Sequence, residues 1–412
     1  MEQISLSMLK CLDKKFGSPF YIMDAEKYRK NITDFLDAFK IRYDKVLAGY
    51  SFKTNYVPAL ISVSKEEGCL AEVVSEMEYE LAMKLGFKQI IFNGPIKRPY
   101  MLERAIKDGS IINLDSEYEV DYICKYKDKH PNDELAVGLR VNINMIDDDG
   151  NSSIQCGLRF GRFGFPSDII GVNIERLRNA GVGIVSVHGH TSTSDRAVQN
   201  FKIITEQMLA VCEKYNLDGL KYFDIGGGFF GAAPEGMDIT GRPKYEDYAN
   251  CVLDVLLKND WFVLHRPTIV IEPGSSVVSN VFKYYTKVYQ NKRVGKMHFV
   301  MVDGTIFDVK PTMHSNILPH KAYTDSIGVK TCVCDVVGST CMEKDVILKD
   351  VELPVLKAGD FIEFQGVGAY TISLTPTFIN FLEPILMEKD GEYVEVRRRQ
   401  DINDVLSVYN LK

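Results

Sequence analysis

A lysine that follows an apolar segment is the first residue whose type and place could carry chemistry. Residues 46–55 read Val-Leu-Ala-Gly-Tyr-Ser-Phe-Lys-Thr-Asn, so Lys53 stands at the end of a run with strand character. Lysine is uncommon beside a buried strand because removing an ammonium group from water is costly. The same desolvation lowers a lysine pKa and makes the amine a nucleophile toward carbonyl groups. On this segment alone, an ordinary surface lysine at a strand end is the more frequent alternative.

Two further segments place glycine or histidine directly after an apolar run. The backbone N–H groups of Ile225-Gly-Gly-Gly228 can surround a phosphate, although glycines also mark simple turns. The turn lacks the G-x-G-x-x-G spacing of dinucleotide-binding proteins. His188 and His190 precede Thr191-Ser-Thr193, and zinc would need a third ligand that no residue supplies at helical or C-x-x-C spacing. An imidazole stacked on a flat cofactor ring fits this segment better, and no metal is expected.

Glu272 ends another apolar run, ahead of Pro273 and Gly274. A buried carboxylate without a partner is unstable, so Glu272 is expected to face a cation or a protonated ring nitrogen. In a closed barrel the last strand lies beside the first, which would bring Glu272 next to the strand before Lys53.

The segments that must position these residues alternate between strand and helix. Helical periodicity is found over Glu76–Leu85, Tyr100–Lys107, Glu117–Lys127, Ser167–Asn179 and Val198–Lys214, with Ser167 and Asp168 as expected N-cap residues. Ala25–Lys40 reads as an earlier helix. The apolar strand segments are Val46–Ser51, Leu70–Val74, Ile90–Asn93, Ile111–Asp115, Ala136–Asn142, Val182–His188, Tyr222–Ile225 and Thr268–Glu272. Eight such units match a (β/α)8 TIM-like barrel, although an open doubly wound sheet would show the same alternation.

The polar residues at the strand exits favour the barrel. Barrel enzymes have their active sites at the C-terminal ends of the strands. In this chain every predicted strand has a polar or glycine residue at or just after that end. Any one of them is explained by entry into a loop, but the whole set is not. The set is Lys53, Glu72, Asn93, Asp115, Arg140 with Asn142, His188 with His190, Asp224 before the glycines, and Glu272.

After Glu272 the chain changes to short β segments separated by turns. Tyr284–Tyr289, Phe299–Val302, Cys332–Val337 and Asp360–Phe364 are the clearest of them. We therefore predict an α/β protein with a barrel over residues 25–274 and a second, antiparallel β domain formed by residues 1–24 plus 275–412.

Composition excludes several classes of partner. The net charge of −7 comes with interspersed signs, so no basic patch for nucleic acid or a membrane surface is present. No apolar run reaches the about 20 residues of a membrane span, and residues 1–10 lack the features of a signal peptide. The nine cysteines show no C-x-x-C pair, which favours free thiols in a reducing cytoplasm.

Taken together, these motifs resemble the pyridoxal 5′-phosphate (PLP) enzymes of the diaminopimelate, ornithine and arginine decarboxylase family, which has the alanine-racemase-like fold. Their order and spacing hold over nearly the whole chain, although each is weak alone. The matching segments are Ser51-Phe-Lys53-Thr-Asn55, Ala71-Glu-Val-Val-Ser-Glu76, Leu139-Arg140-Val-Asn142, His188-Gly-His190, Asp224-Ile-Gly-Gly-Gly-Phe229, Glu272-Pro-Gly274, Gly338-Ser-Thr-Cys341-Met-Glu-Lys-Asp345 and Gly368-Ala-Tyr370.

The resemblance implies a role for each matching residue. Lys53 would bind PLP covalently, His190 would stack on its ring, and Glu272 would pair with the ring nitrogen, which makes the ring a full electron sink. Cys341 would cross a homodimer interface and help place the proton after CO2 leaves, although a buried apolar role is the common alternative for a free cysteine. The remaining cofactor contacts would come from Glu72, Arg140, Thr193, Gly226, Gly227, Gly228 and Tyr370.

Three departures from the family pattern fall on the expected substrate contacts. Ser275 follows Glu-Pro-Gly where diaminopimelate decarboxylases carry arginine. Their Arg-Pro-x-x-Tyr motif is replaced in this chain by Lys310-Pro-Thr-Met-His314. Cys341-Met-Glu343 replaces Cys-Glu-Ser. Replacing an arginine that grips a carboxylate is not conservative. We therefore expect Ser275, Lys310, His314 and Asp345 to line the substrate site of a decarboxylase that acts on a diaminopimelate-like or otherwise modified amino acid.

Two alternatives remain at this point. A racemase or epimerase could share the fold, but no two-base arrangement can be identified, and racemases place an arginine against the ring nitrogen. A silent paralogue that binds a protein partner would not need Lys53, Glu272 and Cys341 together.

Overall fold

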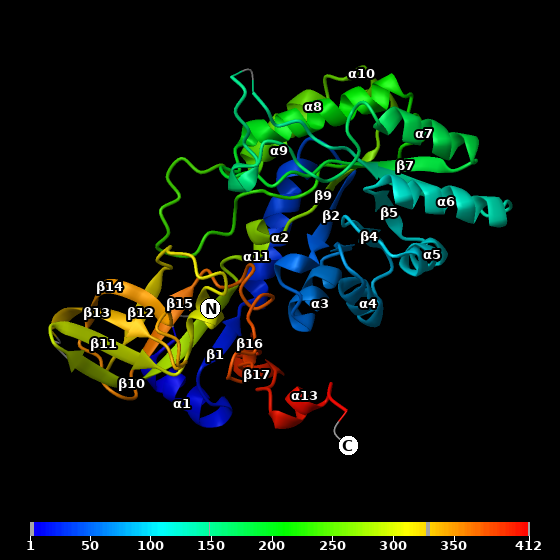
Figure 1. The fold of residues 1–412 in the computed structure, drawn as a ribbon. Coiled ribbons are helices and arrows are strands. Elements are labelled where there is room, and N and C mark those ends of the chain that lie inside the picture. The colour runs from blue at the N-terminus through cyan, green and yellow to red at the C-terminus, as the bar shows by residue number, and fades with distance from the viewer. Residues whose placement is uncertain (1–3, 148, 327–329, 411–412) are drawn as a thin grey trace. The chain divides into compact units, whose positions relative to one another are not determined.

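The computed structural model describes residues 4–147, 149–326 and 330–410, and the chain divides into two compact units (Figure 1). The barrel unit comprises Arg29–Gly231 and Thr240–Val277. The sheet unit comprises Met1–Tyr28, Ala232–Ile239 and Val278–Lys412.

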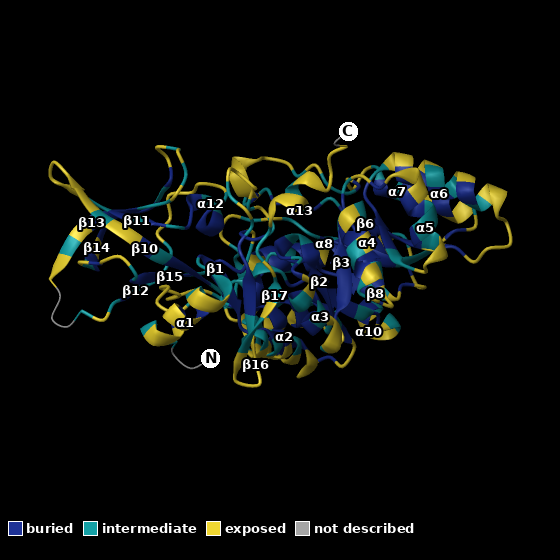
Figure 2. Cartoon of the chain, turned by 90° about the horizontal axis from the view of Figure 1, so that it is seen from below, coloured by how far each residue is buried: buried dark blue, intermediate teal, exposed yellow. Residues whose placement is uncertain are grey.

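The barrel unit is a closed barrel of eight strands, as the alternation predicts. Every neighbouring pair is parallel, and the first strand closes the ring by pairing Val46 with Ile269 of the last. These strands are buried on both faces, which explains why they read as continuous apolar runs in the sequence (Figure 2). They are β2 (Val46–Ser51), β3 (Leu70–Val73), β4 (Ile90–Phe92), β5 (Ile111–Leu114), β6 (Ala136–Arg140), β7 (Gly183–His188), β8 (Tyr222–Asp224) and β9 (Thr268–Ile271).

Helices surround this barrel and bury one face against it, while their outer faces are exposed (Figure 2). No helix among the described residues is both long and apolar enough to span a bilayer. The helices are α2 (Ala25–Lys40), α3 (Pro58–Glu66), α4 (Glu76–Lys84), α5 (Pro99–Lys107), α6 (Glu117–Lys129), α7 (Ile170–Asn179), α8 (Val198–Lys214), α9 (Tyr245–Leu256), α10 (Asp260–His265) and α11 (Ser275–Val278).

The predicted start of one helix is wrong. Ser167 and Asp168 do not cap α7, because the helix begins at Ile170 and Ile169 is its N-cap residue, without a side-chain cap. The carbonyl of Pro166 accepts the N–H groups of both Ile169 and Ile170, so a turn stands where the cap was expected.

The described residues of the sheet unit form a sheet of nine strands, which confirms a second, β-rich domain. Its sheet is mixed rather than antiparallel throughout, because β1 pairs with β16 and β11 with β13 in parallel. The N-terminal strand belongs to this sheet through antiparallel pairing with β10. The strands are β1 (Phe20–Met23), β10 (Phe282–Val294), β11 (Met297–Val302), β12 (His320–Tyr323), β13 (Thr331–Val337), β14 (Val346–Pro354), β15 (Phe361–Gln365), β16 (Ile385–Lys389) and β17 (Glu392–Arg397).

Three further helices lie in the described part of the sheet unit, and none of them was predicted. They are α1 (Leu6–Phe16), α12 (Ile306–Val309) and α13 (Ile402–Leu406). A signal for α1 was present, because Ser5 caps it by accepting the N–H of Met8, and Leu9 and Leu12 are buried three residues apart.

A fully buried ion pair fixes the segment between β4 and α5 of the barrel. Lys97 and Glu119 are both 0 % exposed, and the ammonium lies 3.3 Å from each carboxylate oxygen. Lys97 also donates to the carbonyl of Gly94 at 2.9 Å, and Glu119 accepts the N–H of Asp115 at 2.7 Å. The pair thereby ties the exits of β4 and β5 together.

Removing one partner of this pair should destabilise the chain strongly. Glu119→Gln leaves the Lys97 ammonium buried without a countercharge, so we expect a loss of about 3–5 kcal/mol in the free energy of unfolding, measured by urea denaturation. The matched control is Glu103→Gln, which breaks the exposed pair with Lys107 and should change stability by less than about 1 kcal/mol. Equal effects of the two substitutions would contradict this role for the buried pair.

Candidate active site

A hydrogen-bond chain runs across the C-terminal end of the barrel from Lys53 to Glu272. The Lys53 ammonium donates to Oε2 of Glu72 at 2.9 Å. The Nδ2 group of Asn93 lies 3.0 Å from Oε1 of Glu72 and 2.6 Å from Oε1 of Glu272. Glu72, Asn93 and Glu272 are all buried. The exits of β2, β3, β4 and β9 therefore meet in one polar site, as the strand-exit pattern predicts.

Lys53 is less buried than the sequence suggested. Its side chain retains 35 % exposure, because it lines a cavity of about 480 Å³. Arg140, Asn142 and His190 also line this cavity. This position leaves room for a carbonyl compound to approach the amine, so access rather than complete desolvation is the feature that marks Lys53.

His190 is a neutral imidazole at this cavity. Burial, with a smaller contribution from the Arg140 charge, lowers the pKa of His190 to about 3. Nδ1 lies 3.1 Å from both the N–H and the carbonyl oxygen of Gly227, so the backbone of that residue orients the ring in either tautomer. A neutral, oriented ring suits the predicted stacking on a flat cofactor.

The glycine turn after β8 is required by close packing. Gly226 has a φ of +67°, and a Cβ atom there would lie 2.6 Å from Cβ of His190. A Cβ atom on Gly227 would lie 2.4 Å from the carbonyl oxygen of Glu272. Neither position accepts a side chain, so the turn presents bare backbone beside His190 and Glu272.

Glu272 also lies beside two groups that the sequence did not assign to the site. His188 Nε2 is 3.5 Å from Oε2 of Glu272, and one donor or acceptor atom each of His188, Asp224 and Glu272 lies within 4.8 Å of the others. Burial and Arg140 lower the pKa of His188, so its ring is neutral. Neither of its nitrogens has a hydrogen-bond partner among the described residues. The cluster therefore offers carboxyl oxygens to an incoming cation.

The Arg140 charge is balanced within the barrel. Its guanidinium lies 3.1 Å from Asp115 and donates to the carbonyl of His190 at 3.2 Å. Arg140 therefore holds the backbone that carries His190, in addition to lining the cavity. Its assignment to cofactor binding stays a prediction.

Two other predicted residues of the barrel unit lie near the site with less direct support. The hydroxyl of Thr193 accepts a hydrogen bond from Asn200 at 3.0 Å, whereas its neighbours Thr191 and Ser192 line the cavity. Ser275 begins α11 and is half-buried. Their contacts with cofactor and substrate remain predictions.

The other predicted residues belong to the sheet unit. Cys341 and His314 are exposed, and Tyr370 is 42 % exposed with a φ of +54°. Lys310 is buried, and burial lowers its pKa. The exposed His314 is partly desolvated, and this desolvation, with a smaller contribution from the Lys310 charge, lowers its pKa.

Asp345 is buried in the turn that carries Cys341. One carboxylate oxygen accepts the N–H of Ile306 at 2.7 Å, and the other accepts the N–H and the hydroxyl of Thr340 at 2.9 and 2.7 Å. These contacts fix the turn in front of Cys341. They support a positioning role, while a direct contact between Asp345 and substrate stays a prediction.

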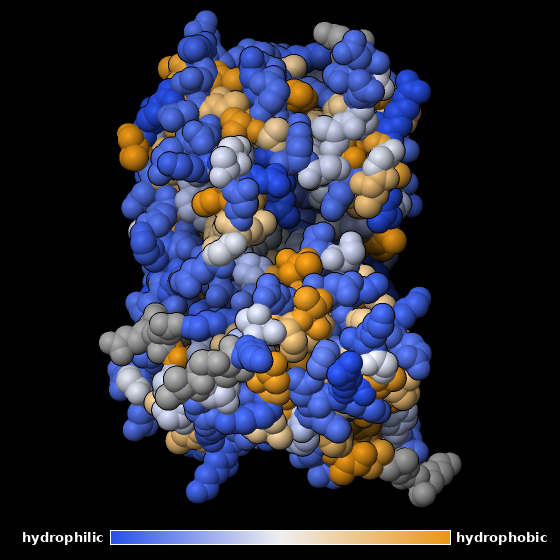
Figure 3. Space-filling model, turned by 90° about the vertical axis from the view of Figure 1, so that its left-hand side faces the viewer, coloured by the Kyte–Doolittle hydropathy of each residue, from blue (hydrophilic) through white to orange (hydrophobic). Residues whose placement is uncertain are grey.

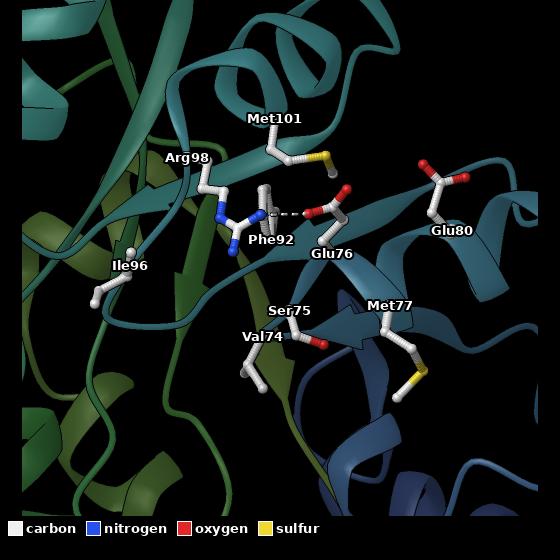
Figure 4. Close-up of a pocket in the computed structure, with 9 residues that line it drawn as sticks. All are labelled: Val74, Ser75, Glu76, Met77, Glu80, Phe92, Ile96, Arg98 and Met101. Atoms are coloured by element: carbon white, nitrogen blue, oxygen red, sulfur yellow. Dashed lines mark hydrogen bonds and ion pairs between the residues drawn. The ribbon is translucent and has the colours of Figure 1, made fainter. Parts of the chain in front are cut away.

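A second hollow of the barrel unit, about 710 Å³, lies between α4 and the segment that leads into α5 (Figure 4). Arg98 and Glu76 pair across it at 3.5 Å. It shares only Val74 with the lining of the Lys53 cavity and contains no predicted site residue. We therefore place the site at the Lys53 cavity.

The predicted site contained Lys53 and Glu272 but not Asn93 and Asp224, which link or neighbour the predicted residues inside the barrel. Asn93 and Asp224 both stood among the polar strand exits, which was the available signal. Their importance depends on contacts across the barrel, such as the one between Asn93 and Glu272, 179 positions apart. Periodicity and local spacing carry no information about such a contact.

The residues present fit the predicted cofactor. The glycine turn offers bare backbone to a phosphate, His190 offers a neutral ring face, and Glu272 offers a buried carboxylate to a ring nitrogen. Lys53 lines the cavity with its amine accessible.

Known proteins resemble this chain over its whole length. The model of the family described as pyridoxal-dependent decarboxylase, pyridoxal binding domain, matches residues 28–279. Diaminopimelate decarboxylase of Helicobacter pylori strain J99 is 29 % identical, with 96 % of each chain covered. A crystal structure of the Helicobacter pylori enzyme complexed with L-lysine matches with a TM-score of 0.83 and 26 % identity, covering 97 % of this chain and 98 % of that one.

The fold is also shared with the diaminopimelate decarboxylase of Methanocaldococcus jannaschii, whose structure matches with a TM-score of 0.86 at 24 % identity. It covers 98 % of this chain and 94 % of that one. The family match extends over more than half of the 412 residues. The chain therefore belongs to the pyridoxal-dependent decarboxylases, an enzyme family, and residues 28–279 are its PLP-binding domain.

Proposed function

We propose that this chain is a PLP-dependent decarboxylase of a diaminopimelate-like or otherwise modified amino acid. The observation that carries the proposal is the buried chain of hydrogen bonds from Lys53, at the cavity, through Glu72 and Asn93 to Glu272. Lys53, at one end of this hydrogen-bond chain, would attach the cofactor covalently. Glu272, at the other end, would face the ring nitrogen of the cofactor. The similarity to diaminopimelate decarboxylases over 96 % of both chains supports the substrate class.

Lys53, the glycine turn, Glu272 and His190 each have a definable task in this reaction. PLP, when bound, supplies the electron sink for the electron pair that a departing carboxylate leaves behind. Lys53 would hold it, the glycine turn would bind its phosphate, and Glu272 would keep its ring nitrogen protonated. His190 would cover one ring face and exclude water from it, and its low pKa keeps it from adding a second positive charge.

Borohydride reduction of the PLP-loaded protein should fix the pyridoxyl group to Lys53. Peptide mapping by mass spectrometry would identify the modified lysine. Lys97 is the internal control, because it is a lysine of the same unit that is fully buried against Glu119 and should stay unmodified. Labelling of another lysine, or none in a protein shown to contain PLP, would contradict the assignment.

We also propose that two copies assemble with shared active sites, each supplying Cys341 to the other. The Cys341 turn is joined to residues 370–381 through the bond from Asn380 to Ser339 at 3.3 Å. That segment exposes several large apolar side chains, which is typical of an interface; they are Tyr370, Leu374, Phe378, Ile379 and Phe381. Figure 3 shows how apolar side chains gather in small groups on a largely hydrophilic face. Cys341 would then give a proton to the carbon that has lost CO2.

Mixing two inactive variants should restore part of the activity if sites are shared. Lys53→Ala and Cys341→Ala chains that form a heterodimer would contain one intact site, so we expect up to about half of the wild-type activity per heterodimer. Differently tagged chains allow the heterodimer to be purified and assayed. A verified heterodimer without recovery would mean that each site is built within one chain.

The substrate contacts differ from those of the diaminopimelate pattern. Ser275 carries no charge, and Lys310 with His314 provides cationic character without the planar fork that holds a carboxylate at two points. Desolvation lowers the pKa of both groups. We infer a substrate whose distal end is larger, neutral or differently charged than that of diaminopimelate.

Steady-state kinetics on meso-diaminopimelate, lysine, ornithine and arginine should reflect these departures. The loss of one charge-assisted contact weakens transition-state binding by about 1.5–3 kcal/mol, which lowers kcat/KM about ten- to a hundredfold. Ser275→Arg should recover part of that loss for diaminopimelate alone. A wild-type kcat/KM for diaminopimelate of about 10⁴ M⁻¹s⁻¹ or above would overturn the inference.

A further inference from the structure

One buried carboxyl group at the Glu272 end of the site has no task in the chemistry proposed above. Asp224 ends β8 and is 1 % exposed. It lies beside His188 of β7, its paired residue in the sheet, and near Glu272, which follows β9. Its Oδ1 atom accepts the N–H of Gly226 at 3.0 Å.

The charges around Asp224 do not balance if every carboxyl group is ionised. Lys53 is paired with Glu72 at 2.9 Å, and Arg140 with Asp115 at 3.1 Å. His188 is neutral. The carboxyl groups of Asp224 and Glu272 are then left within 4.8 Å of each other, both buried.

A single protonated ring nitrogen can neutralise only one of these two carboxylates. Two buried carboxylates at such a distance, with one cation between them, would leave an uncompensated charge. One proton shared by the pair removes that charge. The pair would then carry a net charge of −1, which matches the one cation it is expected to meet.

We propose that Asp224 keeps its proton at neutral pH and donates it in a hydrogen bond to Glu272, which it thereby positions. The N–H of Gly226 donates a hydrogen bond to Oδ1 of Asp224, so we place the proton on Oδ2. Asn93 already donates to Oε1 of Glu272 at 2.6 Å, and Asp224 supplies a further donor. The consequence for function rests on the proposed role of Glu272 opposite the ring nitrogen.

The electrostatic environment agrees with this arrangement. Burial raises the pKa of Asp224 well above its ordinary value, and the charges of Glu272 and, more weakly, Glu72 raise it further. The Gly226 N–H opposes the shift. Asp224 is thus a positioning residue that acts through Glu272.

Infrared spectroscopy of the cofactor-free protein tests the proton directly. Protonated carboxylic acids have a carbonyl stretch separate from that of carboxylates, and Asp224→Asn should remove one such band at pH 7 from the wild-type spectrum. Asp115→Asn is the matched control, because it removes a buried aspartate of a neighbouring strand exit that is paired with Arg140, and it should leave that band unchanged. An unchanged band in Asp224→Asn would overturn the proposal.

The pH dependence of unfolding gives an independent readout in the same cofactor-free protein. A group that holds its proton when folded and releases it on unfolding makes the folded state less stable as pH rises above its unfolded pKa, about 3.9 for aspartate. Asparagine cannot release a proton. Between about pH 5 and 7 the folded-to-unfolded ratio of the wild type should therefore fall relative to Asp224→Asn, by up to about tenfold per pH unit.

Parallel stability profiles of the two proteins would contradict the proposal, because an ionised Asp224 would release no proton on unfolding. Should Asp224→Asn fail to fold, Asp224→Ser supplies a smaller neutral donor for the same comparison. A sloping difference with either variant supports a protonated Asp224.

Titration of the cofactor-free variants with PLP separates this inference from the proposed function. Asp224→Asn keeps a donor toward Glu272 and should bind PLP within a few-fold of wild type, whereas Asp224→Ala should bind about ten- to a hundredfold more weakly. Equal weakening by both would contradict positioning through a hydrogen bond. Failure of the wild type to bind PLP would overturn the proposed function, while the infrared and unfolding results would still decide whether Asp224 is protonated.

Discussion

The rest of this structure depends on one constraint, which is that the carboxyl groups buried inside the barrel must be compensated. Glu72, Asp224 and Glu272 are buried together at the ends of three parallel strands. Such groups persist only where hydrogen bonds, cations or protons compensate them. Lys53 compensates Glu72, Asn93 bridges Glu72 and Glu272, and a protonated ring nitrogen would compensate Glu272. The requirement for balance thus connects the stability of the barrel to the cofactor it binds.

The barrel and the ends of its site could be predicted because they leave local signals. Strands buried on both faces must be apolar, and the residues that leave them at the C-terminal end must be polar, so β2 was predicted with its observed bounds and Glu72 and Glu272 were found from their positions. The start of α7 was not predictable in this way. Ser167 and Asp168 have suitable side chains for a cap, but the carbonyl of Pro166 takes the N–H groups in their place.

The sequence did not predict correctly which lysine side chains are buried. Lys53 was expected to be buried and is partly exposed, whereas Lys97, which follows no strand-exit signal, is fully buried against Glu119. The difference lies in partners that are distant in sequence: Glu119 is 22 positions from Lys97 and lies on α6, after α5 and β5. A lysine with a complete set of acceptors stabilises the fold, while one that faces a cavity is available for chemistry. The sequence alone does not separate these two cases.

The proposed reaction is the removal of CO2 from an amino acid at Lys53 and the residues hydrogen-bonded to it. Incubating the PLP-loaded protein with a panel of free and conjugated amino acids, and measuring CO2 release together with the optical purity of the remaining substrate, tests it most directly. We expect CO2 and the matching amine in equal amounts from at least one member of the panel, with no release by Lys53→Ala. Loss of optical purity without CO2 from any of them would contradict it and favour a racemase on the same fold.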